Sequence, residues 1–361
     1  MPLDTLNLCF STVFALLGII GSTANLLVVL PNVRYLTRIA PSSFLVFWLC
    51  LFDSVAVANS VVISLSNLAS GEINFDADSC RLNAGVAVFG NISSILLCFG
   101  LTLFRYLIVV HQKDLPKNFA TWFLLGVVFS ATLVAVLPFI MGSQEHTYKM
   151  RPCNAHCAPD WSQRDIKSSI LIWICFSIAT ITLCFVVYAY GAMAGTIVQV
   201  FTGVKNVGRG GGTSKPGKSR KIRQQTDKME RTSTVEQTTN SMLSNEGTSS
   251  NMSSQKNSLS RDAQHTLKLE KRQRDIMMQS IVVVGAFMIG WAPYICMAAY
   301  EYFSNSRVSP AVDFAATGVV AIYELVNPLI IMHFDRDIGK NCRRAFFSLT
   351  CKRQIKKGPM F

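Results

Sequence analysis

Long apolar stretches alternate with short polar connections along the whole chain. Each apolar run reaches the ~20 residues that an α-helix needs to cross the ~30 Å hydrocarbon core of a bilayer. Seven such runs follow one another, at residues 8–33, 43–68, 79–110, 119–141, 169–201, 276–300 and 310–334. Only helices and closed barrels satisfy their backbone in lipid, and continuous runs of this length are not barrel strands. The pattern predicts an all-α membrane protein, a bundle of seven transmembrane helices.

The charge distribution predicts how this bundle is oriented. The chain has a net charge of +13, and its Lys and Arg gather in the connections after the first, third and fifth runs and in the tail. The connections after the second and fourth runs are mixed or acidic. Cytoplasmic loops carry the excess of Lys and Arg. We therefore expect a multi-pass plasma-membrane protein with its N-terminus outside and its C-terminus in the cytoplasm, and a role in binding nucleic acid is disfavoured.

The polar segments leave no room for a soluble domain. Residues 1–7 are expected to be an extracellular N-terminus, and 8–201 to hold five helices joined by short loops. Residues 202–272 are rich in Gly, Ser, Thr and basic residues and cannot bury enough apolar surface to fold, so we expect a disordered, basic third intracellular loop. Residues 273–334 would hold the last two helices.

The tail, 335–361, is expected to begin with a short amphipathic helix that lies on the membrane surface. Ile338, Cys342, Ala345 and Phe346 fall on one face of this helix, at spacings of three or four residues. Cysteines in a basic segment next to the membrane are candidates for palmitoylation, and Cys351 is the better candidate in this tail.

Each apolar run also carries a polar or aromatic signature. Any one of them is a weak signal, but they occur in a fixed order, one per run. They are Asn25, Asp53, the Arg105 that follows Cys80 by 25 residues, Trp122, Tyr190-Gly191, the segment 290–294 (Gly-Trp-Ala-Pro-Tyr) and Asn327-Pro328. In this order the chain resembles the rhodopsin-like (class A) G-protein-coupled receptors through all seven predicted helices.

The resemblance implies a receptor rather than an enzyme. It would bind an extracellular ligand and activate a heterotrimeric G protein by an outward movement of the sixth helix, with arrestin, receptor kinases and membrane lipid as further partners. The residues at the positions of the family's coupling and activation switch are Arg105, Tyr106, Tyr190, Phe287, Trp291, Pro293, Asn327 and Pro328.

Two departures from the family pattern have opposite expected effects. Phe104 stands where the family has an acid that holds Arg105 in the inactive state, and Asp275 is a candidate substitute. Loss of this ion pair predicts elevated basal signalling. Ile331 replaces the Tyr that would join Tyr190 in the active state. These departures keep open the alternative of a receptor-like scaffold that does not couple.

The resemblance also implies a disulfide and a candidate cation site. Cys80 would pair with a cysteine in the connection after the fourth run, and Cys157 and Cys153 both remain candidates. Asp53, Ser94 and Asn327 would line a small polar cavity that holds Na⁺ or, alternatively, only a hydrogen-bond network. Glu324 adds a second acid one turn before Asn327, which is unusual for the family. No Cys/His metal cluster is evident in the sequence.

The family's ligand pocket lies between the third, fifth, sixth and seventh helices. Its lining here would be apolar and aromatic, with a few amides and phenols, as most ligand pockets are. The residues at these positions are Asn83, Ala87, Asn91, Trp291, Tyr294, Met297 and Ala321. Ala87 stands where receptors for amines carry Asp, and Ala321 where opsins carry the Lys that binds retinal. Neither an amine ligand nor a retinal cofactor is therefore expected.

Charges at the outer ends of the helices point to a short peptide as the first hypothesis for the ligand. Glu301, Arg307 and Arg81 could contact such a peptide. A lipid-like or other small molecule is the alternative. A transporter is less favoured, because charge inside the predicted helices is nearly limited to Asp53, Glu324 and Arg105.

Overall fold

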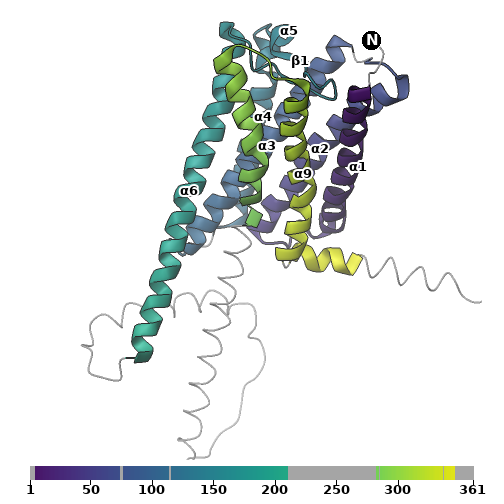
Figure 1. The fold of residues 1–361 in the computed structure, drawn as a ribbon. Coiled ribbons are helices and arrows are strands. Elements are labelled where there is room, and N and C mark those ends of the chain that lie inside the picture. The colour runs from purple at the N-terminus through teal and green to yellow at the C-terminus, as the bar shows by residue number, and fades with distance from the viewer. Residues whose placement is uncertain are drawn as a thin grey trace, which may run out of the picture. The chain divides into compact units, whose positions relative to one another are not determined.

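Long helices make up almost all of the chain that the structure describes (Figure 1). The computed structural model describes residues 5–73, 76–113, 115–209, 282–283, 285–335 and 337–345. The chain divides into two units, residues 1–193 with 273–361 and residues 194–272. The fold and the sites below belong to the first unit.

Six helices in the described ranges are long and apolar enough to cross a membrane. The helices are α1 (Thr5–Asn32), α2 (Pro41–Ser70), α3 (Ala77–Val109), α4 (Lys117–Ile140), α6 (Ile166–Arg209) and α9 (Pro310–Phe334). Residues 285–304 form a further helix in the place of the predicted sixth span. Short elements η1 (Val33–Tyr35) and α5 (Gln144–Thr147) follow α1 and α4. The prediction of an all-α membrane protein is confirmed.

The expected disorder of 202–272 does not hold at its beginning. Residues 202–209 are helical and continue α6 to Arg209. Residues 210–272, Asp275 and Cys351 lie outside the described residues.

Local signals explain where several of these helices begin and end. Pro41 and Pro310 open α2 and α9, where the missing N–H of proline costs no helical hydrogen bond. Asp76 caps α3 by accepting a hydrogen bond from the Ser79 backbone N–H at 3.0 Å. Gly71 ends α2 with φ of 67°, a left-handed conformation that glycine adopts readily.

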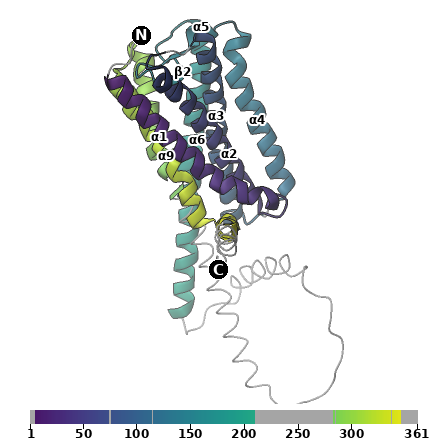
Figure 2. The ribbon, with the colours of Figure 1, turned by 90° about the vertical axis from the view of Figure 1, so that its right-hand side faces the viewer.

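Neighbouring helices pack in the order α4, α3, α2, α1 and α9, as Figure 2 shows. Gly90 on α3 lies so close to α2 that an added Cβ would be 2.7 Å from the Cβ of Ala56. Such close approach of small residues is a common basis of helix packing in lipid. The outward faces carry large apolar side chains, such as Trp122 and Phe129 on α4, which suit a hydrocarbon surrounding.

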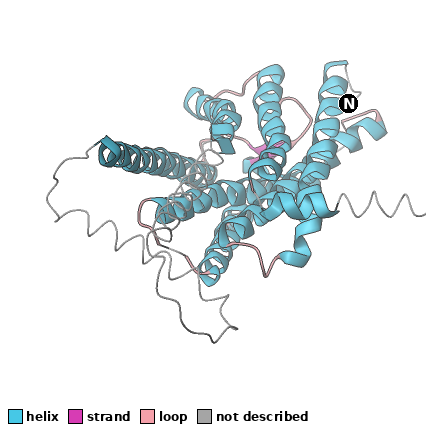
Figure 3. Cartoon of the chain, turned by 90° about the horizontal axis from the view of Figure 1, so that it is seen from below, coloured by secondary structure: helices cyan, strands magenta, loops and turns pink. Residues whose placement is uncertain are grey.

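A β-hairpin at one end of the bundle (Figure 1) holds the two strands of the described chain, which are magenta in Figure 3. Strands β1 (Tyr148–Met150) and β2 (Cys157–Pro159) are antiparallel, with Met150 opposite Cys157. Cys157 forms the disulfide with Cys80 on α3, which settles the choice between the two predicted partners. Cys153 remains a free, buried cysteine in the turn. We call this end of the bundle the hairpin end, and the opposite end the Arg105 end.

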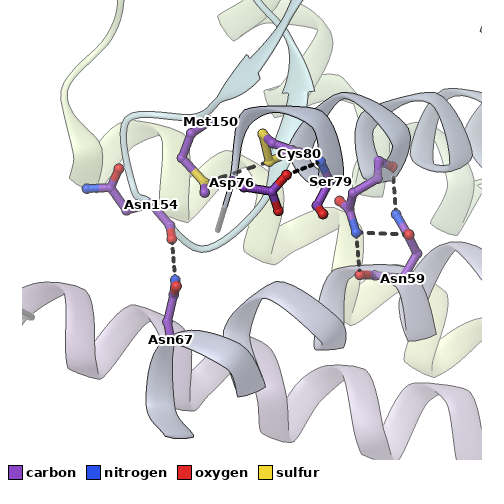
Figure 4. Close-up of a disulfide and its surroundings, with 9 residues drawn as sticks. Asn59, Asn67, Asp76, Ser79, Cys80, Met150 and Asn154 are labelled. Carbon is purple, nitrogen blue, oxygen red and sulfur yellow. Dashed lines mark hydrogen bonds between the residues drawn. A yellow bond between two sulfur atoms is a disulfide. The ribbon is translucent and has the colours of Figure 1, made fainter. Parts of the chain in front are cut away.

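Hydrogen bonds also fix the hairpin turn to α2. Asn67 donates to the Asn154 carbonyl at 2.9 Å, a bond that Figure 4 shows, and Ser64 donates to the Ala155 carbonyl at 3.2 Å. Asn83, a predicted ligand contact, exchanges hydrogen bonds with Asn59 of α2, the residue labelled in Figure 4. Polar side chains that leave water must be paired, and α2 and the hairpin satisfy each other here.

A buried ion cluster joins the hairpin to two helices. The guanidinium of Arg151 is bidentate to Glu301, with Nη1–Oε2 at 2.9 Å and Nη2–Oε1 at 3.0 Å. It also donates from Nε to Asp313 Oδ1 at 3.0 Å. At most 2% of each side chain is exposed. Arg151 comes from the hairpin, Glu301 from helix 285–304 and Asp313 from α9, so one cation ties three segments together.

The short helix 337–345 follows α9 at the Arg105 end. Asp335 caps it by accepting from the Ile338 backbone N–H at 3.0 Å, and Ser43 donates to the same carboxylate at 2.9 Å. Ile338 and Cys342 are buried, while Lys340 and Arg343 are exposed. The helix is therefore amphipathic, as predicted, and Phe346 lies beyond the described residues.

Removing Arg151 should destabilise the fold strongly. Arg151→Ala leaves two buried carboxylates without their cation, and breaking a buried ion cluster in this way costs about 3–5 kcal/mol. Thermal unfolding of the purified protein in detergent measures the effect. The control is Arg81→Ala, which removes a pair with the largely exposed Asp78 and should cost less than about 1 kcal/mol. Equal shifts of the unfolding midpoint in both variants would contradict the role given to Arg151.

Candidate functional site

Two adjoining cavities lie beneath the hairpin. The first, about 60 Å³, is bounded by α1, α2, α3 and α9 and reaches Glu324, so we call it the Glu324 cavity. The second, about 70 Å³, is bounded by α3, α6 and helix 285–304 and reaches Trp161, so we call it the Trp161 cavity. Both are lined by Ala87, Asn91, Ala158, Trp291 and Tyr294. Because Ala158 belongs to β2, the hairpin forms a wall of both.

Five of the seven predicted ligand-binding residues line these cavities. They are Ala87, Asn91, Trp291, Tyr294 and Ala321. Asn83 and Met297 do not line either cavity. Asn83 pairs with Asn59, and the buried Met297 places its sulfur 4.0 Å from Arg151 Nη2. Sequence position alone did not show that these two side chains face neighbouring protein.

Glu324 adds an acid to the Glu324 cavity that was not included in the predicted ligand site. Its side chain is 8% exposed, and no hydrogen bond to its carboxyl is found among the described residues. Three other polar atoms of this lining are buried without a hydrogen-bond partner in the same part of the chain, namely Trp291 Nε1, Thr317 Oγ1 and His156 Nε2. An unpaired buried polar group is costly, so this lining suits a ligand that supplies partners.

The backbone around Glu324 is firmly held. The side chain of Asn25 on α1 donates to the Glu324 carbonyl at 3.1 Å and is itself fully buried. This bond crosses from α1 to α9. The position of the Glu324 Cα relative to the rest of the bundle is therefore fixed by the residue at the family's Asn position in the first helix.

The three predicted Na⁺ ligands lie together below this cavity. Ser94 donates to Asp53 Oδ1, and Asn327 Nδ2 donates to Asp53 Oδ2 at 2.9 Å. All three side chains are almost fully buried, and Asn327 Oδ1 has no partner among the described residues. The arrangement joins α2, α3 and α9. Binding of Na⁺ to it stays a prediction.

An aromatic stack connects the cavities with the middle of the bundle. Trp291 lies beside Phe287 with ring centroids 6.2 Å apart, and Phe287 meets Tyr323 of α9 edge-on at 5.8 Å. Gly290 permits this packing, because an added Cβ would lie 2.5 Å from the Tyr323 Cβ. Pro293, one turn further along helix 285–304, is exposed. A displacement of Trp291 would therefore shift Phe287 and, through it, Tyr323 of α9.

At the Arg105 end, the predicted switch residues take several different environments. Arg105 is 6% exposed, and its Nη1 is buried with no hydrogen-bond partner among the described residues. Phe104 is fully buried and packs on Phe119 with centroids 5.5 Å apart. Tyr106 lies with its hydroxyl 3.4 Å from that of Tyr188. The remaining switch residues are Tyr190, which is half-buried, and Pro328, which is buried.

A group of potential metal ligands at the hairpin end was also missed. Cys153, His156 and Asp313 are all buried, and each offers a ligand atom within 4.8 Å of the others. Burial lowers the pKa of His156 to about 4 and raises the pKa of the Cys153 thiol well above its usual value. The spacing Cys153-x-x-His156 was visible in the sequence. Asp313, 160 residues after Cys153, was not connected to it.

Comparison with known proteins agrees with this architecture. The sequence matches the family model of the 7 transmembrane receptor (rhodopsin family) over residues 24–330. The crystal structure of squid rhodopsin superposes with a TM-score of 0.69 at 14% sequence identity, covering 97% of this chain and 89% of the squid chain. This low identity shows the fold alone. A search among curated proteins finds no match.

The family match covers far more than half of the chain, in line with the helices and with the disulfide between α3 and the hairpin. Proteins of this family are receptors rather than enzymes, and they cross the membrane several times. The chain therefore belongs to the rhodopsin family of seven-transmembrane receptors.

Proposed function

We propose that this chain is a plasma-membrane G-protein-coupled receptor for a small molecule that carries a positively charged group. The hairpin end faces outside and the Arg105 end faces the cytoplasm, in accord with the basic connections after the first and third helices. The observation that carries the proposal is an unpaired buried acid, Glu324, in a cavity covered by the hairpin.

The charges at the hairpin end favour a small molecule over a peptide. Glu301, a predicted contact for a peptide, is fully buried and bound to Arg151. Arg307 pairs with Asp160, and Arg81 pairs with Asp78 and Glu145. These groups already have partners within the protein. A peptide would have to break these pairs and move β2, whereas a small molecule needs only the space below.

The acid in the cavity favours a cationic group on that molecule. A carboxylate in an apolar surrounding is costly unless a cation or hydrogen-bond donors pair with it. Intramembrane acids usually mark a functional site for this reason. Ala87 leaves the usual amine-binding position without charge, but Glu324 supplies a carboxyl to the same cavity from α9. A protonated amine that reaches Glu324 would satisfy it.

The proposed activation passes from the cavity to the G protein through helix 285–304. A ligand that contacts Trp291 favours the arrangement of the Trp291–Phe287–Tyr323 stack to which it binds more tightly. Rearrangement of the stack lets the inner part of the helix move outward, and Pro293 weakens the helix at this level. Arg105 then becomes accessible to the G protein. Because no carboxylate pairs with Arg105 in the described chain, little opposes this step.

Ligand-free signalling should be measurable and should depend on Arg105. Arg105→Ala should abolish basal cAMP or Ca²⁺ signals, because it removes the side chain proposed to contact the G protein. The comparison uses cells with matched surface expression. Arg34→Ala, at an exposed position after α1, is the control and should keep the basal signal. Silence of the unmodified receptor, or a signal that survives in Arg105→Ala, would contradict this coupling mechanism.

Responses to small amines should depend on Glu324. A screen of protonated amines in the same assay should yield agonists whose potency falls about 10–100-fold in Glu324→Gln, since a hydrogen bond to a charged group contributes about 1.5–3 kcal/mol. Gln keeps the size of the side chain and removes the charge. Glu72→Gln, an exposed acid at the hairpin end, is the matched control. Equal potency in both variants would remove the cation assignment but leave the Arg105 result intact.

A further inference from the structure

The turn of the hairpin brings a thiol and an imidazole together. Asn154 adopts a left-handed conformation with φ of 54°, and its N–H donates to the Arg151 carbonyl at 2.9 Å. The Arg151 N–H donates to the His156 carbonyl at 3.1 Å and closes the turn. As a result, Cys153 Sγ lies 3.4 Å from His156 Nδ1. Cys and His are the usual zinc ligands, and zinc sites commonly take two ligands from positions only a few residues apart.

Helix α9 brings a carboxylate to the same place. Asp313 Oδ2 accepts a hydrogen bond from the Cys153 backbone N–H at 3.2 Å. The ligand atoms of Cys153, His156 and Asp313 all lie within 4.8 Å of one another. Tetrahedral Zn²⁺ with a Zn–S distance of ~2.3 Å and a Zn–N distance of ~2.0 Å holds its sulfur and nitrogen ligands roughly 3.5 Å apart. The observed Sγ–Nδ1 separation therefore fits zinc with little movement.

The charge of the surroundings also fits a dication. Arg151 carries one positive charge, whereas its partners Glu301 and Asp313 carry two negative ones. The buried cluster is thus left with an excess of one negative charge. A Zn²⁺ ion bound to the Cys153 thiolate would add one net positive charge and bring the cluster to neutrality. Burial of charge is tolerated when it is balanced in this way.

Two further observations point to a ligand at this place. His156 is 6% exposed, and Cys153 Sγ is the one hydrogen-bond partner of its ring nitrogens in the described chain, so Nδ1 is available to bind an ion. Cys153 is fully buried and free, although the neighbouring Cys157 forms a disulfide. A Cys153 S–H to His156 hydrogen bond accounts for the short separation but not for the excess negative charge. His156 also lines the Glu324 cavity.

We propose that Cys153, His156 and Asp313 form a Zn²⁺ site that fastens the hairpin to α9, with a water molecule as fourth ligand. Binding releases the thiol proton to solvent, and the Sγ–Zn bond replaces the S–H bond. The site does not depend on the nature of the receptor's ligand or on coupling through Arg105. Its consequence is a hairpin that is held more firmly over the Glu324 cavity when zinc is present.

The direct test measures zinc on the purified full chain in detergent. After removal of metal with a chelator and addition of Zn²⁺, the protein should retain one ion per chain by elemental analysis. Cys153→Ser and His156→Ala should each lower retention at least tenfold. Cys9→Ser and His111→Ala are the matched controls at exposed positions and should retain zinc like the unmodified chain. Retention that is unchanged in Cys153→Ser would overturn the proposal.

A second measurement leaves Cys153, His156 and Asp313 unchanged. It therefore remains valid if Cys153→Ser and His156→Ala fold poorly. The Cys9→Ser protein is treated with a maleimide, and labelling of Cys153 is located by mass spectrometry. Excess Zn²⁺ should slow this labelling at least tenfold and should raise the thermal unfolding midpoint, while Ca²⁺ should do neither, because thiolate and imidazole bind zinc rather than calcium. Equal labelling rates with and without Zn²⁺ would reject the site.

Discussion

The guanidinium of Arg151 is the group on which the hairpin end depends. It is removed from water, and its charge is balanced inside the protein by Glu301 and Asp313. Each partner comes from a different helix, so the pairing fixes the position of the hairpin relative to helix 285–304 and α9 at once. In lipid, where helices gain little from apolar contact alone, such polar contacts contribute to specificity. The cavities keep their shape because this contact places their outer wall.

Between the hairpin and the Arg105 end, groups of polar side chains occur at successive depths of the bundle. The Glu324 cavity contains the acid and is lined by Trp291 of the aromatic stack, and Asp53 joins α2 to α3 and α9 through Ser94 and Asn327. Arg105 lies beyond them. The Glu324 cavity, the aromatic stack and the Asp53 group all include residues of α9, so a change at the cavity can bias the other two through this helix.

The sequence was sufficient for features carried by local patterns. Apolar runs of about 20 residues predicted the spans, and ordered motifs placed Asp53 with Ser94 and Asn327. It was insufficient where contacts join distant segments. Arg151 is separated from Glu301 by 150 residues and from Asp313 by 162, and no local pattern reports such a pairing. The disulfide partner of Cys80 is explained by the register of the two strands. Met150 lies opposite Cys157, which places Cys157 in β2 and Cys153 in the turn between the strands. The pairing of Asn83 with Asn59, 24 residues earlier, is likewise not reported by any local pattern.

The attachment of the hairpin at several points has a kinetic consequence. The hairpin is attached to four helices. A disulfide joins it to α3, hydrogen bonds join it to α2, and the ion cluster joins it to α9 and helix 285–304. A molecule beneath it can leave through this end only when several of these contacts open together, and concerted opening of that kind is infrequent. The lifetime of the bound state then depends on how often the hairpin opens, as well as on the contacts to the ligand. For the proposed ligand, this architecture favours slow dissociation and therefore a prolonged response.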